Sequence, residues 1–155
     1  MVRTRGSTRA DPTDWGTAAT IFALIALCGC GSVPPDEVTR ATSPSGVVDA
    51  MVTEANGGAT TSYYYEVYVA PKGASIARGT RVAWLYGAVR NSGAYGVNLL
   101  WLGPEELRVE YLSAKGQDLT VPSAAVAGHR IRVSLNPGVF DSKAPAGGML
   151  DNKQR

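Results

Sequence analysis

The stretch that decides the fold is 60-TTSYYYEVYVA-70, which has the clearest alternation of side chains in the sequence. Successive side chains of a β-strand point to opposite faces, so residues two apart share a face. One face therefore collects Tyr63, Tyr65, Val67 and Val69, and the other collects Tyr64, Glu66, Tyr68 and Ala70. Aromatic and β-branched residues favour strands. The pattern predicts a strand over residues 60–70, which the turn residues 71-PKG-73 end.

The same alternation recurs along the chain in shorter segments separated by turn residues. Further strands are predicted at residues 47–53, 81–86, 97–102, 107–112 and 129–135. Residues 119–126 fit either a strand or a helical turn. No segment after the N-terminal region keeps a helical period over ten residues. The prediction is an all-β protein, a small antiparallel β-sandwich or curled meander of about six to seven strands, after an N-terminal signal segment.

The N-terminus carries a short apolar segment after a basic leader. Residues 17–27, TAATIFALIAL, contain only two polar residues, and Arg3, Arg5 and Arg9 precede them. A helix of that length spans about 16 Å, about half of a bilayer core of about 30 Å. The segment therefore predicts a secretory signal and not a spanning helix. Because the leader has no Arg-Arg pair, the general secretory route is favoured over the twin-arginine route.

The apolar segment ends in 27-LCGC-30, which resembles the lipobox of bacterial lipoproteins. In that motif a branched apolar residue and two small residues precede the cysteine that is lipidated and becomes the new N-terminus. Leu27, Gly29 and Cys30 match the motif, and Cys28 departs from it mildly. The resemblance implies lipid attachment at Cys30. Ser32, where an Asp would retain the protein, implies sorting to the outer membrane, facing the periplasm.

The two cysteines fit other kinds of site less well. A Cys-x-Cys pair with a single distant histidine falls short of the four ligands of a structural zinc site. A disulfide between residues two apart would be strained. A plain signal peptide, cleaved or uncleaved, remains as the alternative to a lipoprotein.

The sequence predicts four regions. Residues 1–29 are the lipoprotein signal peptide, and removing them from the 155 residues leaves 126. Residues 30–44 are a flexible tether, because Pro34-Pro35 favours an extended chain. Residues 45–140 are the β domain. Residues 141–155, rich in Gly, Ala, Lys and Asp, are a disordered tail.

Two further resemblances concern the β domain. The strings 43-SPSG-46, 57-GGATTS-62 and 101-WLGPEELRVEY-111 are similar to small uncharacterised bacterial lipoproteins with an SPxG…GATT…W pattern. That resemblance implies a β-rich, exported and lipid-anchored protein, with no activity attached. The segment 43-SPSGVVDA-50 also resembles the start of TolB-type β-propeller blades. With only one weaker copy, at residues 101–109, it cannot form the four blades that a propeller needs.

The inventory of catalytic groups is small. His129 is the only histidine, and the chain has no G-x-S-x-G elbow. Glu105, Glu106 and Glu110 are close in sequence, but a charged hairpin turn explains them better than a calcium or glycosidase site. The Gly-rich stretches at residues 57–58 and 87–96 lack the lysine of a phosphate loop. The sequence predicts no catalytic site, no cofactor and no metal.

The net charge of the mature chain and its expected exposed tyrosines indicate which kinds of partner the protein binds. Of 15 basic and 13 acidic residues, three and two leave with the signal, so the mature chain carries 12 and 11, a net charge of +1. Nucleic-acid binding, which needs a clustered basic patch, is therefore not expected. The membrane is a partner through the lipid anchor. If Tyr63 and Tyr65 fill the core, Tyr64 and Tyr68 form a contact face for a protein of the envelope, unless a second sheet covers them.

Three functional hypotheses follow. The first is a lipid-anchored, non-catalytic binding or scaffolding module of the cell envelope. The second is a small inhibitor or immunity-like protein that acts through residues 88–96, expected to form a mobile loop. The third is an enzyme that uses His129 or the glutamate cluster. A solvent-facing His129 would argue against the third hypothesis.

Overall fold

The computed structural model describes residues 35–144 and 149–150. The predicted signal peptide and the predicted lipid site, Cys30, lie outside these residues. No helix in the described part of the chain is long and apolar enough to cross a membrane.

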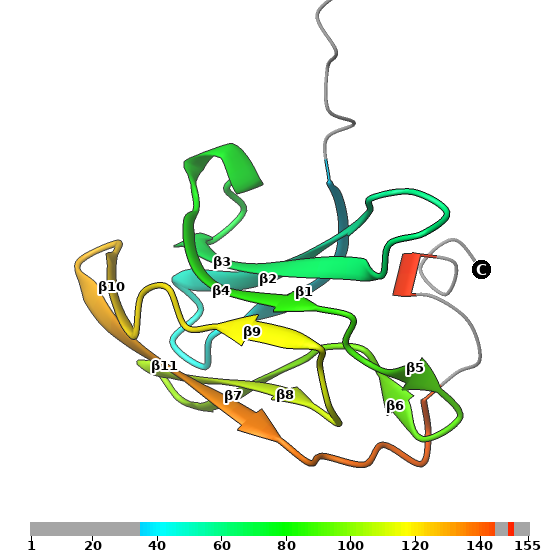
Figure 1. The fold of residues 1–155 in the computed structure, drawn as a ribbon. Coiled ribbons are helices and arrows are strands. Elements are labelled where there is room, and N and C mark those ends of the chain that lie inside the picture. Colours follow the sequence, from blue (N-terminus) through cyan, green and yellow to red (C-terminus); the bar gives the residue numbers. More distant parts are fainter. Residues whose placement is uncertain (1–34, 145–148, 151–155) are drawn as a thin grey trace, which may run out of the picture. The chain divides into compact units, whose positions relative to one another are not determined.

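The first sheet has five strands, of which four consecutive ones pair as an antiparallel meander (Figure 1). They are β1 (Asp36–Thr42), β2 (Val48–Asn56), β3 (Tyr63–Pro71) and β4 (Thr80–Tyr86), and β9 (Gly116–Asp118) pairs with β4 at the far edge. The predicted turn 43-SPSG-46 joins β1 to β2. Its Gly46 N–H donates to the Ser43 carbonyl at 2.8 Å, and the φ of +73° at Gly46 is one that glycine adopts without strain.

The second sheet has four strands in the order β10-β11-β8-β7. They are β7 (Asn98–Gly103), β8 (Glu106–Tyr111), β10 (Ser123–Val126) and β11 (His129–Pro137). Strand β11 runs parallel to β8, and the other pairs are antiparallel. A small hairpin of β5 (Arg90–Asn91) and β6 (Ala94–Tyr95) precedes β7, and a short 3-10 helix, η1 (Ile76–Arg78), precedes β4.

One hydrophobic core joins the two sheets. The five-stranded sheet contributes buried side chains such as Val52, Tyr65, Val67 and Leu85, and the four-stranded sheet contributes Leu107, Val109, Ile131 and Val133. Along β3, β8 and β11 the core residues alternate with exposed or half-buried ones, as expected when one face of each sheet is buried, whereas β2 is buried on both faces from Val48 to Glu54. The all-β prediction is confirmed, and the two layers form a sandwich of open sheets.

The predicted tether, residues 30–44, is wrong for its second half, because β1 occupies Asp36–Thr42 and the domain begins before residue 45. As an edge strand, β1 sends only Val38, which is 4% exposed, into the core. A bulge between Glu37 and Thr39 further interrupts its alternation. Because β1 buries a single apolar side chain, its sequence resembles that of a polar linker.

The predicted disordered tail, residues 141–155, is also wrong where the structure describes it. The Asp141 N–H donates to the Gly93 carbonyl at 2.9 Å. Met149 is fully buried in the core, and Leu150 packs against it. Met149 and Leu150 are large apolar residues in a mostly polar segment, and this feature of the sequence indicates that they pack against the core.

Two segments between the predicted strands contain further short strands. Residues 116–118, for which no strand is predicted, form β9, which extends the first sheet beside β4. Residues 88–96, predicted as a mobile loop, include the β5–β6 hairpin, and Ala88 and Ala94 of this segment are buried. All three strands, β5, β6 and β9, are too short to show a period in the sequence.

Candidate functional site

Six side chains form a continuous surface on the outer face of the five-stranded sheet. Strands β3 and β4 pair so that Tyr64 is opposite Tyr86, Glu66 opposite Trp84, and Tyr68 opposite Arg81. Directly opposite side chains in an antiparallel pair share a face and lie in contact distance. The residues between them, such as Tyr65 and Leu85, are buried in the core. We call this surface the aromatic face: Tyr64, Glu66, Tyr68, Arg81, Trp84 and Tyr86.

The rings of Trp84 and Tyr86 are the centre of the aromatic face. Their planes are nearly parallel, at 6°, with the ring centroids 6.1 Å apart. The Trp84 ring lies over Gly116 of β9, where an added Cβ would be 3.5 Å from it. The Ser62 N–H donates to the Tyr86 hydroxyl oxygen at 3.1 Å, and this hydrogen bond lowers the pKa of Tyr86. Both rings are therefore held in place before any partner binds.

An ion pair stands beside the rings. Arg81 Nη1 lies 2.6 Å from Glu66 Oε1, and the Tyr68 hydroxyl donates to Glu66 Oε2 at 2.8 Å. Burial and the hydrogen bond to Glu66 raise the pKa of Tyr68 to about 12. The Tyr68 ring also packs with Met51 and Ala70 in a small cluster under η1. Tyr68 is thus largely a structural member of the face.

The two residues predicted as a contact face, Tyr64 and Tyr68, do lie on the same outer face. In Figure 1 no described strand lies against that face, and the segment that contains η1 packs on part of it, at Met51 and Tyr68. Trp84 and Tyr86 share this face and were not among the predicted contact residues. The alternation of side chains in residues 81–86 places Trp84 and Tyr86 on the same face of that strand. Only the register between β3 and β4 brings that face beside Tyr64.

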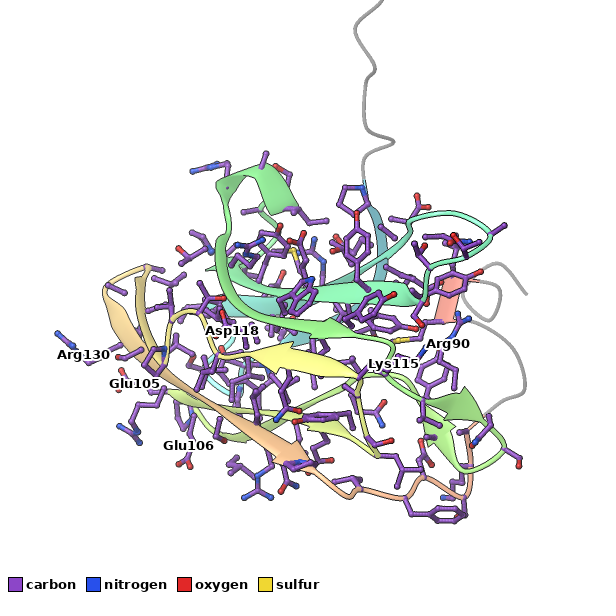
Figure 2. All side chains as sticks on the ribbon, viewed as in Figure 1. Arg90, Glu105, Glu106, Lys115, Asp118 and Arg130 are labelled. Atoms are coloured by element: carbon purple, nitrogen blue, oxygen red, sulfur yellow. The ribbon has the colours of Figure 1, made fainter. Side chains whose placement is uncertain are left out.

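His129 lies at the surface beside a carboxylate. Its Nδ1 is 3.1 Å from Glu105 Oε1, and the two side chains are 36% and 43% exposed. Figure 2 shows Glu105 and Glu106 near the β10–β11 end of the sandwich, far from Arg90. No hydroxyl or thiol of the described residues is hydrogen-bonded to His129. The arrangement is a solvent-facing pair at a strand end, without a nucleophile.

The three glutamates that are close in sequence do not converge in the structure. Glu105 faces His129, Glu106 lies 3.8 Å from Arg132, and Glu110 lies 3.8 Å from Arg108. In the part of the chain that the structure describes, no three His, Cys, Asp or Glu side chains are placed to hold a metal ion.

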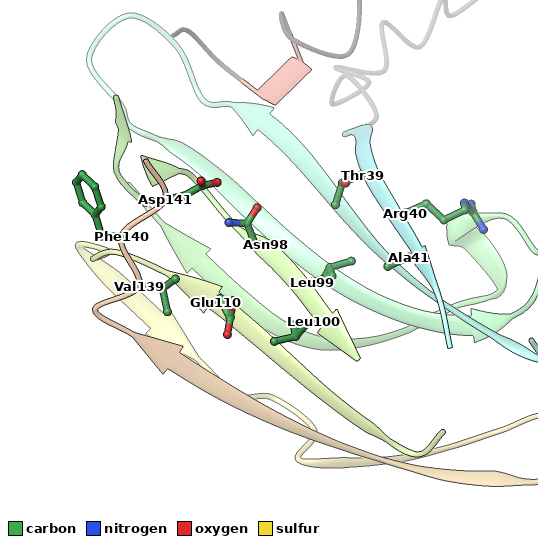
Figure 3. A pocket seen from close by; sticks show the side chains of 10 residues that line it. All are labelled: Thr39, Arg40, Ala41, Asn98, Leu99, Leu100, Glu110, Val139, Phe140 and Asp141. Atoms are coloured by element: carbon green, nitrogen blue, oxygen red, sulfur yellow. The ribbon is translucent and has the colours of Figure 1, made fainter. Parts of the chain in front are cut away.

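A groove of about 550 Å³ runs between the edge strands β1 and β7 (Figure 3). Its walls mix apolar and charged side chains: Thr39, Arg40, Ala41, Asn98, Leu99, Leu100, Glu110, Val139, Phe140 and Asp141. The Trp101 Nε1–H donates to the Ala41 carbonyl at 3.0 Å and so ties the two edges together. Phe140, at one end, is largely exposed.

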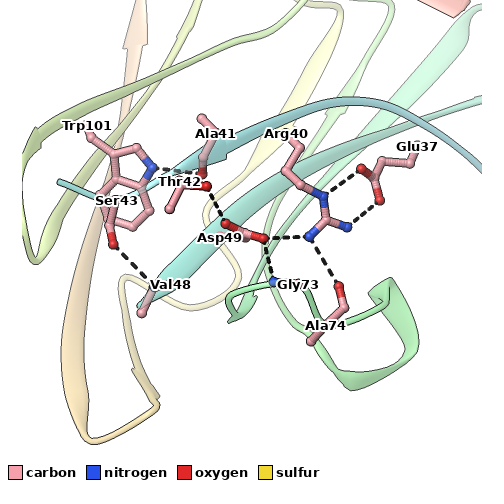
Figure 4. Close-up of polar contacts among 10 residues, drawn as sticks. All are labelled: Glu37, Arg40, Ala41, Thr42, Ser43, Val48, Asp49, Gly73, Ala74 and Trp101. Atoms are coloured by element: carbon pink, nitrogen blue, oxygen red, sulfur yellow. Dashed lines mark hydrogen bonds and ion pairs between the residues drawn. The ribbon is translucent and has the colours of Figure 1, made fainter. Parts of the chain in front are cut away.

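A polar network fixes β1 next to this groove (Figure 4). Asp49 of β2, which is 2% exposed, accepts hydrogen bonds from the Thr42 hydroxyl, from Arg40 Nη1 and from the Gly73 N–H. Arg40 also pairs with Glu37 at 2.7 Å. Burial raises the pKa of Asp49, but the three hydrogen bonds outweigh it, so its pKa lies below the usual value. Both carboxylate oxygens of Asp49 already accept hydrogen bonds from the protein itself. We therefore assign the network to the stability of the fold.

Replacing Asp49 with asparagine is expected to lower the free energy of unfolding at pH 7 by about 2 kcal/mol, since three donors lose a charged acceptor. A carboxyl whose pKa is lowered by folding stabilises above its unfolded pKa of about 3.9, and that stabilisation is lost as the pH falls through the folded-state value. The difference between Asp49→Asn and the parent should therefore shrink at pH 2.5 in urea unfolding. Asp118→Asn, at an exposed site with one bond from Thr120, is the control. An equal deficit at both pH values would contradict this assignment.

A buried charged cluster lies at the opposite end of the sandwich from His129. Glu54 is 3% exposed, and its Oε2 lies 3.3 Å from Arg90 Nη1. The Arg90 guanidinium sits 3.6 Å above the centre of the Tyr63 ring. The Tyr65 hydroxyl is buried here without a hydrogen bond. Burial and the neighbouring Glu54 raise the pKa of Tyr65 above its ordinary value.

The sequence contained a signal for this cluster that was not used. Period two places Glu54 on the same face of β2 as Val48, Ala50 and Val52, which is the core face. A glutamate there needs a partner. That partner is Arg90, from the residues expected to form a mobile loop. Arg90, from residues 88–96, thus points toward Glu54, and the inhibitor hypothesis stays a prediction.

Comparison with known proteins assigns no family, since no family model, no curated protein and no solved structure matches this chain. The fold and the site define a class only: an all-β sandwich with an ordered aromatic face.

Proposed function

We propose that this protein is a lipid-anchored, non-catalytic binding module of the bacterial cell envelope. It is held at Cys30 in the outer membrane, faces the periplasm, and contacts an envelope protein through the aromatic face. The observation that carries the proposal is the gathering of Tyr64, Trp84 and Tyr86 on a sheet face that no described strand covers.

The composition of the aromatic face favours protein contact. Tyrosine, tryptophan and arginine are enriched in protein interfaces and supply most of their binding energy. Trp84 and Tyr86 lose little conformational freedom on binding, because Gly116 and Ser62 already hold them. Arg81 and Glu66, already paired, add polar contacts at the rim without an unpaired buried charge.

The position of β1 limits how far the module stands from the membrane. Only residues 31–35 separate Cys30 from β1. An extended chain spans at most about 3.6 Å per residue, so β1 would begin within about 20 Å of the lipidated cysteine. The expected partner is therefore a protein that presents its surface close to the membrane.

Replacing Tyr64 and Trp84 together with alanine is expected to reduce recovery of the cross-linked partner at least about tenfold, as truncating central interface aromatics does. The measurement is cross-linking in intact cells followed by quantitative mass spectrometry. The matched control is Arg130→Ala with Ser134→Ala, on the exposed outer face of β11. Thermal unfolding of each variant establishes that the sandwich remains folded. Equal recovery of the same partners by both double variants would refute the assignment of the face.

A further inference from the structure

Trp84 stands in a row of three side chains that crosses the aromatic face and continues onto β9. The strand register places Trp84 opposite Glu66 of β3 on one side and opposite Asp118 of β9 on the other. Directly opposite residues share a face and lie within contact distance of each other. The Trp84 ring is therefore flanked by two carboxylates. One of them, Asp118, is exposed on the edge strand of the sheet.

Beside this row, Gly116 leaves a notch in the surface. Gly116 lies opposite Tyr86 in the β4–β9 pair. A Cβ added to Gly116 would be 3.5 Å from Trp84 Cζ3, 3.6 Å from Trp84 Cη2 and 3.7 Å from Tyr86 Cβ, which are ordinary contact distances. A side chain of a partner that reaches over Gly116 therefore meets the six-membered ring of Trp84. We call this place the Gly116 notch.

The charges around Trp84 are not balanced. Glu66 already has two partners, Arg81 at 2.6 Å and the Tyr68 hydroxyl at 2.8 Å. Asp118 accepts a hydrogen bond from the Thr120 hydroxyl at 2.9 Å and forms no ion pair with a described residue. The hydrogen bond to Glu66 and, to a smaller extent, the charge of Asp118 raise the pKa of Arg81. One arginine thus stands among two carboxylates and is held by the first of them.

The place between Trp84 and Asp118 has no cation of its own. In the described part of the chain no cationic group lies over the Trp84 ring. Lys115 is engaged elsewhere, because its Nζ donates to the Ser62 hydroxyl oxygen at 2.7 Å. Figure 2 shows Lys115 and Asp118 at opposite ends of β9. A positive group from another molecule would therefore meet both an aromatic ring and a carboxylate here.

An arginine side chain suits this place. Tryptophan is the aromatic residue that attracts cations most strongly. A guanidinium is flat and weakly hydrated, so it can stack on a ring while it pairs with a carboxylate. We propose that the Gly116 notch binds an arginine of the envelope protein, whose guanidinium stacks on Trp84 and pairs with Asp118. This inference rests on the proposed function and names the group that the aromatic face recognises.

Nuclear magnetic resonance of the purified full chain, isotope-labelled at its tryptophan indoles, tests the notch without a known partner. The probe is the tripeptide Gly-Arg-Gly with blocked ends. It should shift the indole resonance of Trp84 and leave that of Trp101, which is bonded to the Ala41 carbonyl, unchanged. Asp118→Asn should weaken binding about threefold, as losing an exposed ion pair does, and Asp118→Glu should not.

An uncharged probe, Gly-norleucine-Gly, provides the matched control for the guanidinium. It has a side chain of similar reach and should shift the Trp84 resonance much less. Equal shifts from both probes would overturn the inference. So would an unshifted Trp84 resonance with the arginine probe, or equal binding of that probe by Asp118→Lys and the parent chain.

Cross-linking in cells separates this inference from the proposed function. Gly116→Leu fills the notch but keeps every residue of the aromatic face, so it should reduce recovery of the partner, as should Asp118→Lys. Gly103→Leu is the control, since an added Cβ there has nothing within 4 Å. If the Tyr64/Trp84 double variant loses the partner while Gly116→Leu and Asp118→Lys keep it, the proposed function stands and the notch is overturned. If all three keep it, both fail.

Discussion

Replacing Cys30 with serine is expected to abolish acylation and to remove the protein from the outer-membrane fraction. A serine hydroxyl cannot take the place of the thiol to which the first lipid is attached. Each buried CH₂ contributes about 0.8 kcal/mol, so two or three acyl chains hold a protein almost irreversibly, and losing them has a large effect. The measurement is mass spectrometry of the mature N-terminus, together with fractionation of the envelope.

The neighbouring cysteine provides the matched control. Cys28→Ser keeps a small residue at the second position before Cys30, so processing and acylation should be unchanged. The parent protein should begin at residue 30 and carry the mass of its acyl chains. A parent protein that still begins at Met1, or a Cys30→Ser variant that still carries lipid, would refute the anchor.

The strands that could be predicted from the sequence are those with a face buried in the core. Residues 60–70 were predicted and β3 is Tyr63–Pro71; residues 129–135 were predicted and β11 is His129–Pro137. In both, several apolar residues recur at a spacing of two. Strand β1 lacks that pattern, because it is held by the Arg40–Asp49 network and by pairing with β2. Polar contacts between segments that are far apart in the chain produce no regular spacing of residue types, so they cannot be predicted from the sequence.

The candidate site was only partly predictable, for a related reason. Alternation within 60–70 places Tyr64 outward once Tyr65 is buried, and the structure has this arrangement. Which neighbours join Tyr64 depends on register, and the β3–β4 register shifts between Val67 and Tyr68. Likewise, the parallel pairing of β11 with β8 is set by packing of the whole sandwich.

Replacing Arg90 with methionine is expected to lower the free energy of unfolding by about 3 kcal/mol or more. Methionine fills much of the same volume but removes the cation that, among the described residues, pairs with Glu54, a side chain that is 3% exposed. Leaving one member of a buried ion pair without its partner costs about 3–5 kcal/mol, and the cation–π contact with Tyr63 is lost as well. Urea unfolding at pH 7 measures the change. Arg132→Met, at an exposed pair 3.8 Å from Glu106, is the control and should change stability by less than about 1 kcal/mol.

The double variant Arg90→Met with Glu54→Gln separates a lost attraction from an uncompensated charge. If the cost in Arg90→Met comes mainly from burying the Glu54 carboxylate alone, the neutral glutamine removes that cost. The double variant should then be more stable than Arg90→Met itself, which gives a coupling energy of about 1–3 kcal/mol in the thermodynamic cycle. If the two substitutions were additive, Arg90 would stabilise the sandwich through its packing on Tyr63, and Glu54 would not depend on it. Because a well-packed neutral pair often matches a buried ion pair in stability, recovery in the double variant would also mean that the charges at this end are not required for folding.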